Sequence, residues 1–347
     1  MGIETLQFDE GTIQEKYGVE VDYNRAKEVV EMALAHYLSD DESEDNFFTG
    51  KEQPEDRFIQ FLRDNGETED FTLNSLFLLT MMNFSGNTSV FFNRLLSRDD
   101  YEQFRWLFEP SIVAEKTENE VMEAAQVYLN PQGHQSNALI GWHHNCVELM
   151  KYGRDQEGNV IEGVTGNVRE FLRAKNYDAL EIIQALFVRP RARSKEKEFW
   201  RFGPKLSILF LQWVDRYQLC PELTNIDNIG IPVDFEICRL AVQLGIVNIQ
   251  YEVNAHNLSF NILLPMFIKL FKETGWKPRY GSEALWSIGS RGCSRERPLS
   301  QKRNTKCPVK NLCKGVYSKP RDNKGRYYSL DRMGIRYVPW KPSISSY

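Results

Sequence analysis

Hydrophobic residues recur at helical spacing along most of this chain. In the segment 23–38, for example, they fall three or four positions apart and would form one face of an amphipathic helix. Alternation of period two, which is typical of strands, is almost absent, although the glycine-rich segment 153–166 could form a hairpin or a long turn. The pattern therefore predicts a mainly α protein. The expected helices are 23–38, 58–63, 73–82, 89–96, 101–108, 118–128, 136–152, 167–172, 179–187, 206–217, 235–244 and 259–274.

The length of 347 residues is sufficient for one large or two moderate domains. No segment approaches the roughly 18 uninterrupted apolar residues that a membrane helix needs. The acidic N-terminal segment does not have the basic and then apolar order of a secretory signal. We therefore expect a soluble protein of the cytoplasm or nucleus, associated with the nucleoid if it is prokaryotic.

The net charge of −5 conceals an uneven distribution of charged residues. Residues 1–70 carry 20 acidic and six basic side chains, whereas 291–326 carry 12 basic and two acidic ones. Residues 189–205 add seven basic and two acidic side chains. Basic segments of this kind can form a local surface that binds a polyanion whatever the total charge is. The alternative is that they are solvated loops without a partner.

Two short segments carry candidate chemistry. The first, 199–205, ends in Gly203-Pro204-Lys205 and leads directly into an apolar helix, whose first backbone N–H groups are suited to bind a phosphate. In the second, Asp234 follows Pro232 at the position where a helix N-cap is expected. Taken singly, Asp234 could be a cap and nothing more, and Lys205 an exposed lysine.

In this order, the two segments resemble the helix-hairpin-helix DNA glycosylases, the superfamily of endonuclease III and the archaeal 8-oxoguanine glycosylases. Gly203-Pro204-Lys205 is similar to the hairpin ending G-x-K that carries the family's catalytic lysine. Val233-Asp234 with Arg239 is similar to the V-D-x-x-x-x-R segment that carries its catalytic aspartate. The Pro-Val-Asp start and the long separation of the two segments are closest to the archaeal 8-oxoguanine branch.

Further motifs follow in the family's order between about residues 70 and 315. The segment 79–90 resembles L-S-x-Q-x-T, with Asn83 in place of the glutamine that fills the gap left by the extruded base. The segment 284–293 resembles the last helix with its G-x-x-x-C ending. The chain departs from the hairpin pattern L-P-G-x-G, because Trp200 and Arg201 occupy the Pro and first Gly positions, and we expect a differently shaped turn. Glu236 occupies a position where many members have His.

The resemblance implies a DNA N-glycosylase with AP-lyase activity. Asp234 would stabilise the positive charge that develops on the sugar, and Lys205 would attack the anomeric carbon to form a Schiff base. The extruded base would stack in an aromatic pocket, for which Trp286 is the first candidate, ahead of Trp106 and Trp142. Asn83 or Phe84 would fill the gap in the duplex. The leading candidate substrate is 8-oxoguanine, but the sequence does not decide which base is excised.

Double-stranded DNA is the expected partner, and a monomer is the expected state. We expect seven residues of the basic segments and the two motifs to contact the duplex: Arg201, Gly203, Arg239, Arg291, Arg295, Lys302 and Arg303.

Three cysteines near the C-terminus, Cys293, Cys307 and Cys313, resemble part of the iron–sulfur loop of endonuclease III relatives. A [4Fe–4S] cluster needs four thiolates, and the fourth is missing locally. We expect no cofactor, with a loop held by packing; a [4Fe–4S] cluster, or a zinc ion with a distant fourth ligand, are the alternatives.

The family fold implies two helical domains that flank a cleft and include a helix-hairpin-helix motif. One domain would span 70–222, and the other 1–69 together with 223–347. Two different functions compete with the glycosylase. One is an N-glycosidase of a small nucleoside or nucleotide, which would not need the basic segments. The other is a DNA-binding protein that uses the hairpin without catalysis, and it would leave every base in place.

Overall fold

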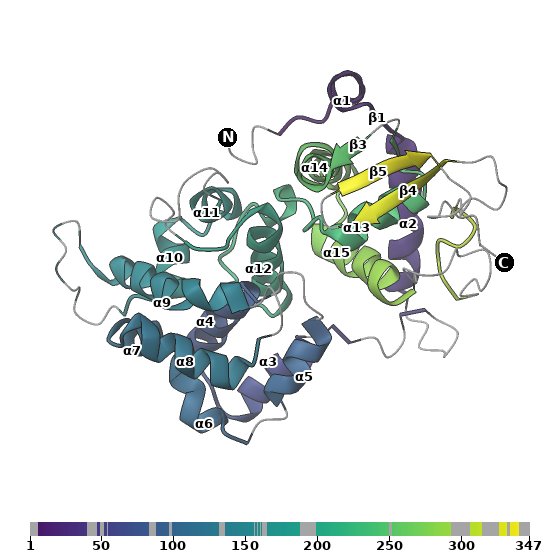
Figure 1. Cartoon of the computed structure of the whole chain (residues 1–347). Helices are drawn as coiled ribbons and strands as arrows, with labels where there is room; N and C mark the ends of the chain where they lie inside the picture. Colours follow the sequence, from purple (N-terminus) through teal and green to yellow (C-terminus); the bar gives the residue numbers. More distant parts are fainter. Residues whose placement is uncertain are drawn as a thin grey trace. The chain divides into compact units, whose positions relative to one another are not determined.

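The computed structural model contains two compact units, Glu52–Ile229 and Thr5–Lys51 with Gly230–Tyr347 (Figure 1). We call them unit 1 and unit 2 and describe each by itself. The structure describes residues 6–39, 47–48, 52–53, 55–82, 88–96, 99–131, 136–155, 157, 159, 161, 165–187, 199–249, 252–292, 306–313, 326–331 and 334–339.

The named secondary-structure elements in the described part of unit 1 are all helices (Figure 1). Many of its helices begin at a side chain that accepts a hydrogen bond from a free backbone N–H, as Thr68 does from the N–H of Phe71. Thr117 and Glu120 form a capping box. The elements in chain order are α3 (Asp56–Asp64), α4 (Glu69–Thr80), α5 (Thr88–Leu96), α6 (Tyr101–Phe104), η2 (Arg105–Phe108), α7 (Pro110–Ala114), α8 (Glu118–Leu129), α9 (Ser136–Met150), η4 (Lys151–Gly153), α10 (Val168–Ala174), α11 (Ala179–Leu186), α12 (Pro204–Arg216) and η6 (Ile226–Asn228).

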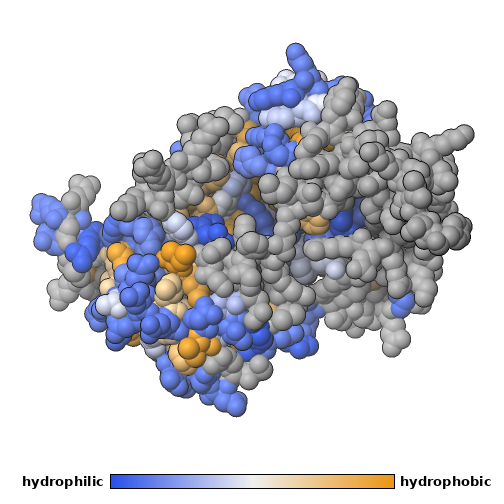
Figure 2. Space-filling view, in the orientation of Figure 1, coloured by the Kyte–Doolittle hydropathy of each residue, from blue (hydrophilic) through white to orange (hydrophobic). Residues whose placement is uncertain are grey.

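The core of unit 1 is built around α4. Every residue of this helix from Phe71 to Thr80 is buried, because α10, α12 and η2 pack against it. Its polar side chains are satisfied inside the helix: the hydroxyls of Ser75 and Thr80 donate to the carbonyls four residues earlier. On the surface, α8 and α9 expose a few apolar side chains, Met122, Val127 and Ile140, among polar ones (Figure 2).

Unit 2 combines helices with short strands. Strand β1 (Val19–Val21) pairs antiparallel with β2 (Val247–Ile249), and β3 (Glu252–Asn254), β5 (Gly334–Pro339) and β4 (Arg326–Asp331) form an antiparallel sheet in that order. Two π-helices, η7 and η8, both contact α13. The helices are α1 (Glu10–Tyr17), α2 (Tyr23–Tyr37), α13 (Phe235–Gln243), η7 (Asn257–Leu263), α14 (Leu264–Thr274), α15 (Pro278–Ser287) and η8 (Ile288–Gly292).

The prediction of a mainly α protein is confirmed. The short strands and α1 were not expected. Strands β1 and β2, with three residues each, are too short to show alternation of period two, and α1 buries only Ile13, so it has no helical repeat of buried apolar residues. The predicted domain boundary at residues 69 and 70 falls within α4, whereas the units divide at 51–52 and 229–230. Within the described part of the chain, no helix has the length and apolar character to cross a membrane.

Candidate active site

Lys205 lies in the first turn of α12. Gly203 is the N-cap, with an extended backbone, and Pro204 occupies the first helical position, where its missing N–H costs nothing. Ser207 N–H donates to the carbonyl of Gly203 at 2.9 Å and closes the turn. The turn contains no acidic residue. Positive charge at this end of a helix opposes the macrodipole, so half-buried Lys205 occupies a position where its charge does not stabilise the helix.

The backbone turns sharply just before α12. Arg201 adopts a left-handed conformation with φ of +69°, which glycine adopts without steric cost and other residues avoid. Arg201 therefore occupies a position that glycine would adopt more readily. Of the residues between α11 and α12, the described ones, 187 and 199–203, are not helical. Residues 188–198 lie outside the described residues.

Aromatic side chains fix this turn to the core of unit 1. The ring of Phe202 stacks on Phe77 of α4, with 4.6 Å between the centroids. Phe199 is fully buried and lies edge-on to Phe77 at 5.3 Å and to Phe171 of α10 at 4.9 Å. Phe210, two turns into α12, contacts Phe77 from another side. The residues before and after Lys205 are thus held by one cluster of rings.

Trp200 is held by helix α9. Its backbone N–H donates to Asn145 Oδ1 at 2.6 Å, and its carbonyl accepts from Asn145 Nδ2 at 3.2 Å. One turn earlier, a Cβ on Gly141 would lie 2.1 Å from Cδ1 of the Trp200 ring, so the ring can approach only because the residue is glycine. We call Gly141 and Asn145 the Trp200 seat. The seat could not be predicted, because nothing in the sequence connects these residues with the turn.

The other end of α12 is held by an ion pair and a hydrogen bond. Arg216 pairs with Asp56 of α3 at 3.0 Å, and the hydroxyl of Tyr217 donates to the same carboxylate at 2.8 Å. Burial, together with Glu55 and Asp56, raises the pKa of the Tyr217 hydroxyl, so it stays a donor.

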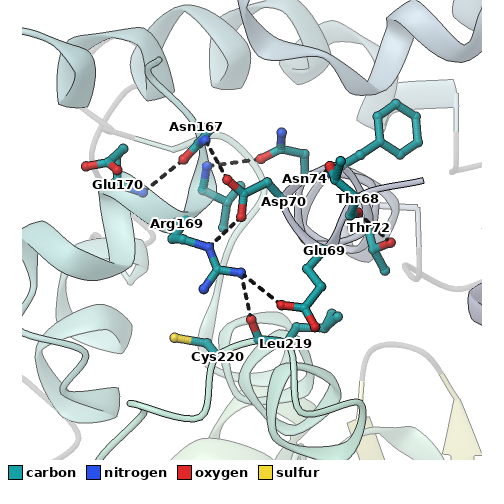
Figure 3. A network of polar contacts seen from close by, with 12 residues as sticks. Thr68, Glu69, Asp70, Thr72, Asn74, Asn167, Arg169, Glu170, Leu219 and Cys220 are labelled. Carbon is teal, nitrogen blue, oxygen red and sulfur yellow. Dashed lines mark hydrogen bonds and ion pairs between the residues drawn. The ribbon is translucent and has the colours of Figure 1, made fainter. Parts of the chain in front are cut away.

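A second network holds the segment that follows α12 (Figure 3). Arg169, in the first turn of α10, pairs with Asp70 of α4 and donates to the carbonyl of Leu219 at 3.0 Å. Asn74 Oδ1 accepts from Val168 N–H at 3.0 Å and fixes the start of α10. Burial raises the pKa of the neighbouring Cys220 thiol to about 12, and its contact with Glu222 acts in the same direction. Helix α12 is therefore fixed within unit 1 at both ends.

Asp234 is the N-cap of α13 in unit 2, as predicted. Its Oδ1 accepts from Ile237 N–H at 3.0 Å, and its carbonyl accepts from Cys238 N–H. The side chain is half-buried. The cap can be inferred from the sequence because it needs only residues within one turn.

A buried ion pair lies one turn further along α13. Arg239, 3% exposed, donates to Glu236 Oε2 at 2.6 Å and also to the carbonyl of Gly289 in η8. A Cβ on Gly289 would lie 3.3 Å from Glu236 Cβ, so the two helices are in close contact. The guanidinium of Arg239 thus joins α13 to η8 inside unit 2, and its contact with DNA stays a prediction.

Some of the remaining predicted site residues lie in the described part of the chain, and the others lie outside it. A Cβ added to Gly203 would have no neighbouring atom within 4 Å. Trp286, on α15, is half-buried. Burial lowers the pKa of the Arg201 guanidinium. Trp142 is a core residue whose indole N–H donates to the carbonyl of Leu107 at 2.8 Å. Six residues and one side chain lie outside the described residues: Asn83, Phe84, Cys293, Arg295, Lys302, Arg303 and the side chain of Arg291.

Cys307 and Cys313 lie in a turn that packs on unit 2. Cys307 is buried, and Cys313 Sγ is 4.0 Å from the carbonyl of Gln243 at the end of α13. Arg25 of α2 donates to the carbonyl of Leu312 and ties the turn to that helix. Among the described residues, no group of three or more His, Cys, Asp or Glu side chains is arranged to hold a metal ion. Packing and hydrogen bonds attach the described part of this turn to unit 2, and Cys293 lies outside the described residues.

Comparisons of the chain with protein-family models, with curated proteins and with solved structures found no match. The resemblance to the glycosylases therefore remains a prediction from the sequence motifs.

Proposed function

We propose that this chain is a DNA N-glycosylase with AP-lyase activity that extrudes and excises a damaged or modified base from double-stranded DNA, with 8-oxoguanine as the leading substrate. Lys205 is the nucleophile, and Asp234 is the carboxylate that stabilises developing positive charge. The proposal includes a helix-hairpin-helix motif that ends at Gly203-Pro204-Lys205, within a monomer of two helical domains.

The observation that carries the proposal is the position of Lys205. A lysine in the first turn of α12, without an acidic residue in that turn, does not stabilise the helix. The turn before it is nevertheless held by a ring stack and by two hydrogen bonds to a buried amide. An unfavourable charge in a firmly held place is typical of a functional residue rather than of a structural one.

The chemistry follows from the two side chains. The neutral ε-amine of Lys205 forms a bond to C1′ while the N-glycosidic bond breaks, and the base leaves with the bonding electrons and takes up a proton. Asp234 stabilises the positive charge that develops on the sugar. The nitrogen then gives up one proton, and O4′ takes up a proton as the sugar ring opens, which leaves a protonated imine. Loss of a 2′ proton expels the 3′ phosphate and cleaves the strand.

Borohydride trapping tests this proposal, because borohydride reduces the imine to a stable amine. The purified protein would be incubated with duplexes that contain 8-oxoguanine, uracil, thymine glycol or an abasic site. We expect an adduct that Lys205→Gln abolishes and that Lys175→Gln, a lysine of unit 1 at the end of α10, leaves unchanged. Asp234→Asn should lower base release by at least about 100-fold, as expected for loss of an electrostatic group at the reacting centre.

The alternatives give different results. A DNA-binding protein without catalysis would bind the duplexes, with strong salt dependence, and release no base. An N-glycosidase of small substrates would release base from nucleosides and not bind duplex DNA. An adduct that persists in Lys205→Gln would overturn the assignment of the nucleophile.

A further inference from the structure

The seat of Trp200 has an unusual chemical requirement. Asn145 is fully buried, and its side-chain amide satisfies both the N–H and the C=O of one backbone residue, as a neighbouring strand would. The backbone N–H can only donate and the carbonyl can only accept, which fixes the orientation of the amide. A side chain at this position must therefore be able to donate and accept at once.

The seat controls the direction in which the chain enters α12. Four residues lie between Trp200 and Lys205, and three of them have little conformational freedom. Arg201 is in the left-handed conformation, Phe202 is stacked on Phe77, and Pro204 has a fixed φ. A shift of Trp200 on α9 is therefore passed on to the first turn of α12.

We propose that Asn145 is a positioning residue for Lys205: its amide holds the backbone of Trp200 so that the first turn of α12 presents the lysine in a reactive orientation. This inference rests on the proposed function. Asn145 does not touch the substrate and acts through the turn. Misplacement of a reacting group by about 1 Å can cost about 100-fold in rate, so loss of the clamp should affect imine formation far more than DNA binding.

The test compares Asn145→Leu with a matched control, Asn74→Leu. Asn74 is also a buried asparagine of unit 1, but its Oδ1 holds Val168 at the start of α10 rather than the turn before Lys205. Two quantities are measured for each variant: hydrogen exchange in peptides that span 199–206, and the single-turnover rate of borohydride trapping on an abasic duplex.

We expect Asn145→Leu to speed exchange in 199–206 and to slow trapping by about 10- to 100-fold, with the duplex Kd unchanged within about twofold. Asn74→Leu should loosen the start of α10 and leave trapping within about threefold of the wild type. Equal slowing in both variants would mean a general loss of stability and would overturn the inference. Unchanged exchange, or unchanged trapping, in Asn145→Leu would overturn it as well.

A second variant covers the case in which Asn145→Leu does not fold. The carboxyl introduced by Asn145→Asp can donate and accept when protonated but only accept when ionised, and burial favours the protonated form. The ratio of the variant's trapping rate to the wild-type rate should therefore be near one at acidic pH and fall as the pH rises. Asn74→Asp should give a flat ratio, because an ionised carboxylate can still accept from Val168. A flat ratio for Asn145→Asp would overturn the inference.

Failure of the proposed function gives a distinct result. If the wild type forms no adduct on any duplex, the catalytic proposal fails, and the role of Asn145 in that reaction fails with it. The exchange measurement would then still show whether Asn145 holds the turn. If the wild type does form the adduct and Asn145→Leu retains its rate, the glycosylase proposal stands and this inference alone is wrong.

Discussion

The structures that hold Lys205 and Asp234 are built from different interactions. The turn before Lys205 is held by neutral groups: stacked phenylalanine rings and one buried amide. The helix that begins at Asp234 is held by a buried ion pair, Glu236 with Arg239, and by the contact of Arg239 with Gly289. Removal of one partner from a buried neutral hydrogen bond costs about 1–3 kcal/mol, whereas removal of one partner from a buried ion pair costs about 3–5 kcal/mol. The two regions should therefore respond differently to mutation.

The largest effect is expected for Arg239→Met. Removal of the guanidinium leaves Glu236 buried beside Gly289 without its partner, which should cost about 3–5 kcal/mol of folding free energy. Urea unfolding, with hydrogen exchange in α13 to locate the loss, measures it. The double variant Glu236→Leu/Arg239→Met should recover most of the loss, because a buried pair replaced as a whole by apolar groups costs little. A single variant that loses less than about 1 kcal/mol would contradict the importance assigned to this pair.

An intermediate effect is expected at Arg201, where φ is +69°. Because this conformation costs a non-glycine residue about 1–2 kcal/mol, Arg201→Gly should be more stable than Arg201→Val by about that amount. Thermal unfolding of the two variants measures the difference. At Arg173, inside α10, the order should reverse, since glycine is the poorer residue in a regular helix. If the glycine and valine variants had the same order of stability at both positions, the left-handed conformation of Arg201 would be contradicted.

The smallest effect is expected for the stability of Lys205→Gln. Loss of a positive charge from the first turn of α12 should raise the free energy of unfolding by about 0.3–1 kcal/mol at low salt, and less at high salt. Lys175→Gln, at the C-terminal end of α10, should change stability in the opposite direction. A Lys205→Gln variant that is less stable than the wild type would show that the lysine contributes to the fold, and would weaken the argument for a catalytic role.

Part of the candidate site could be predicted from the sequence because it depends on near neighbours. The cap at Asp234 needs only the N–H of Ile237, three residues away, and Pro204 next to Gly203 marks the start of α12. The enclosed position of Arg239 could not be predicted from the sequence for the opposite reason. One of its partners, Gly289, is 50 residues away, and no local pattern separates an arginine that faces solvent from one that is enclosed. The Trp200 seat was not predicted for the same reason, because Asn145 and Trp200 are 55 residues apart in the chain.

The sequence by itself determined the mainly helical character of the chain, the positions of most helices, the cap at Asp234, and two motifs with candidate chemistry. These features depend on the 3.6-residue period and on hydrogen bonds within one turn, which the order of residues specifies directly. Only the tertiary structure decided that β1 pairs with β2, that Arg239 is enclosed and that Asn145 clamps Trp200. Each of these joins residues far apart in the chain, and such contacts form because the packing of whole helices brings their partners together.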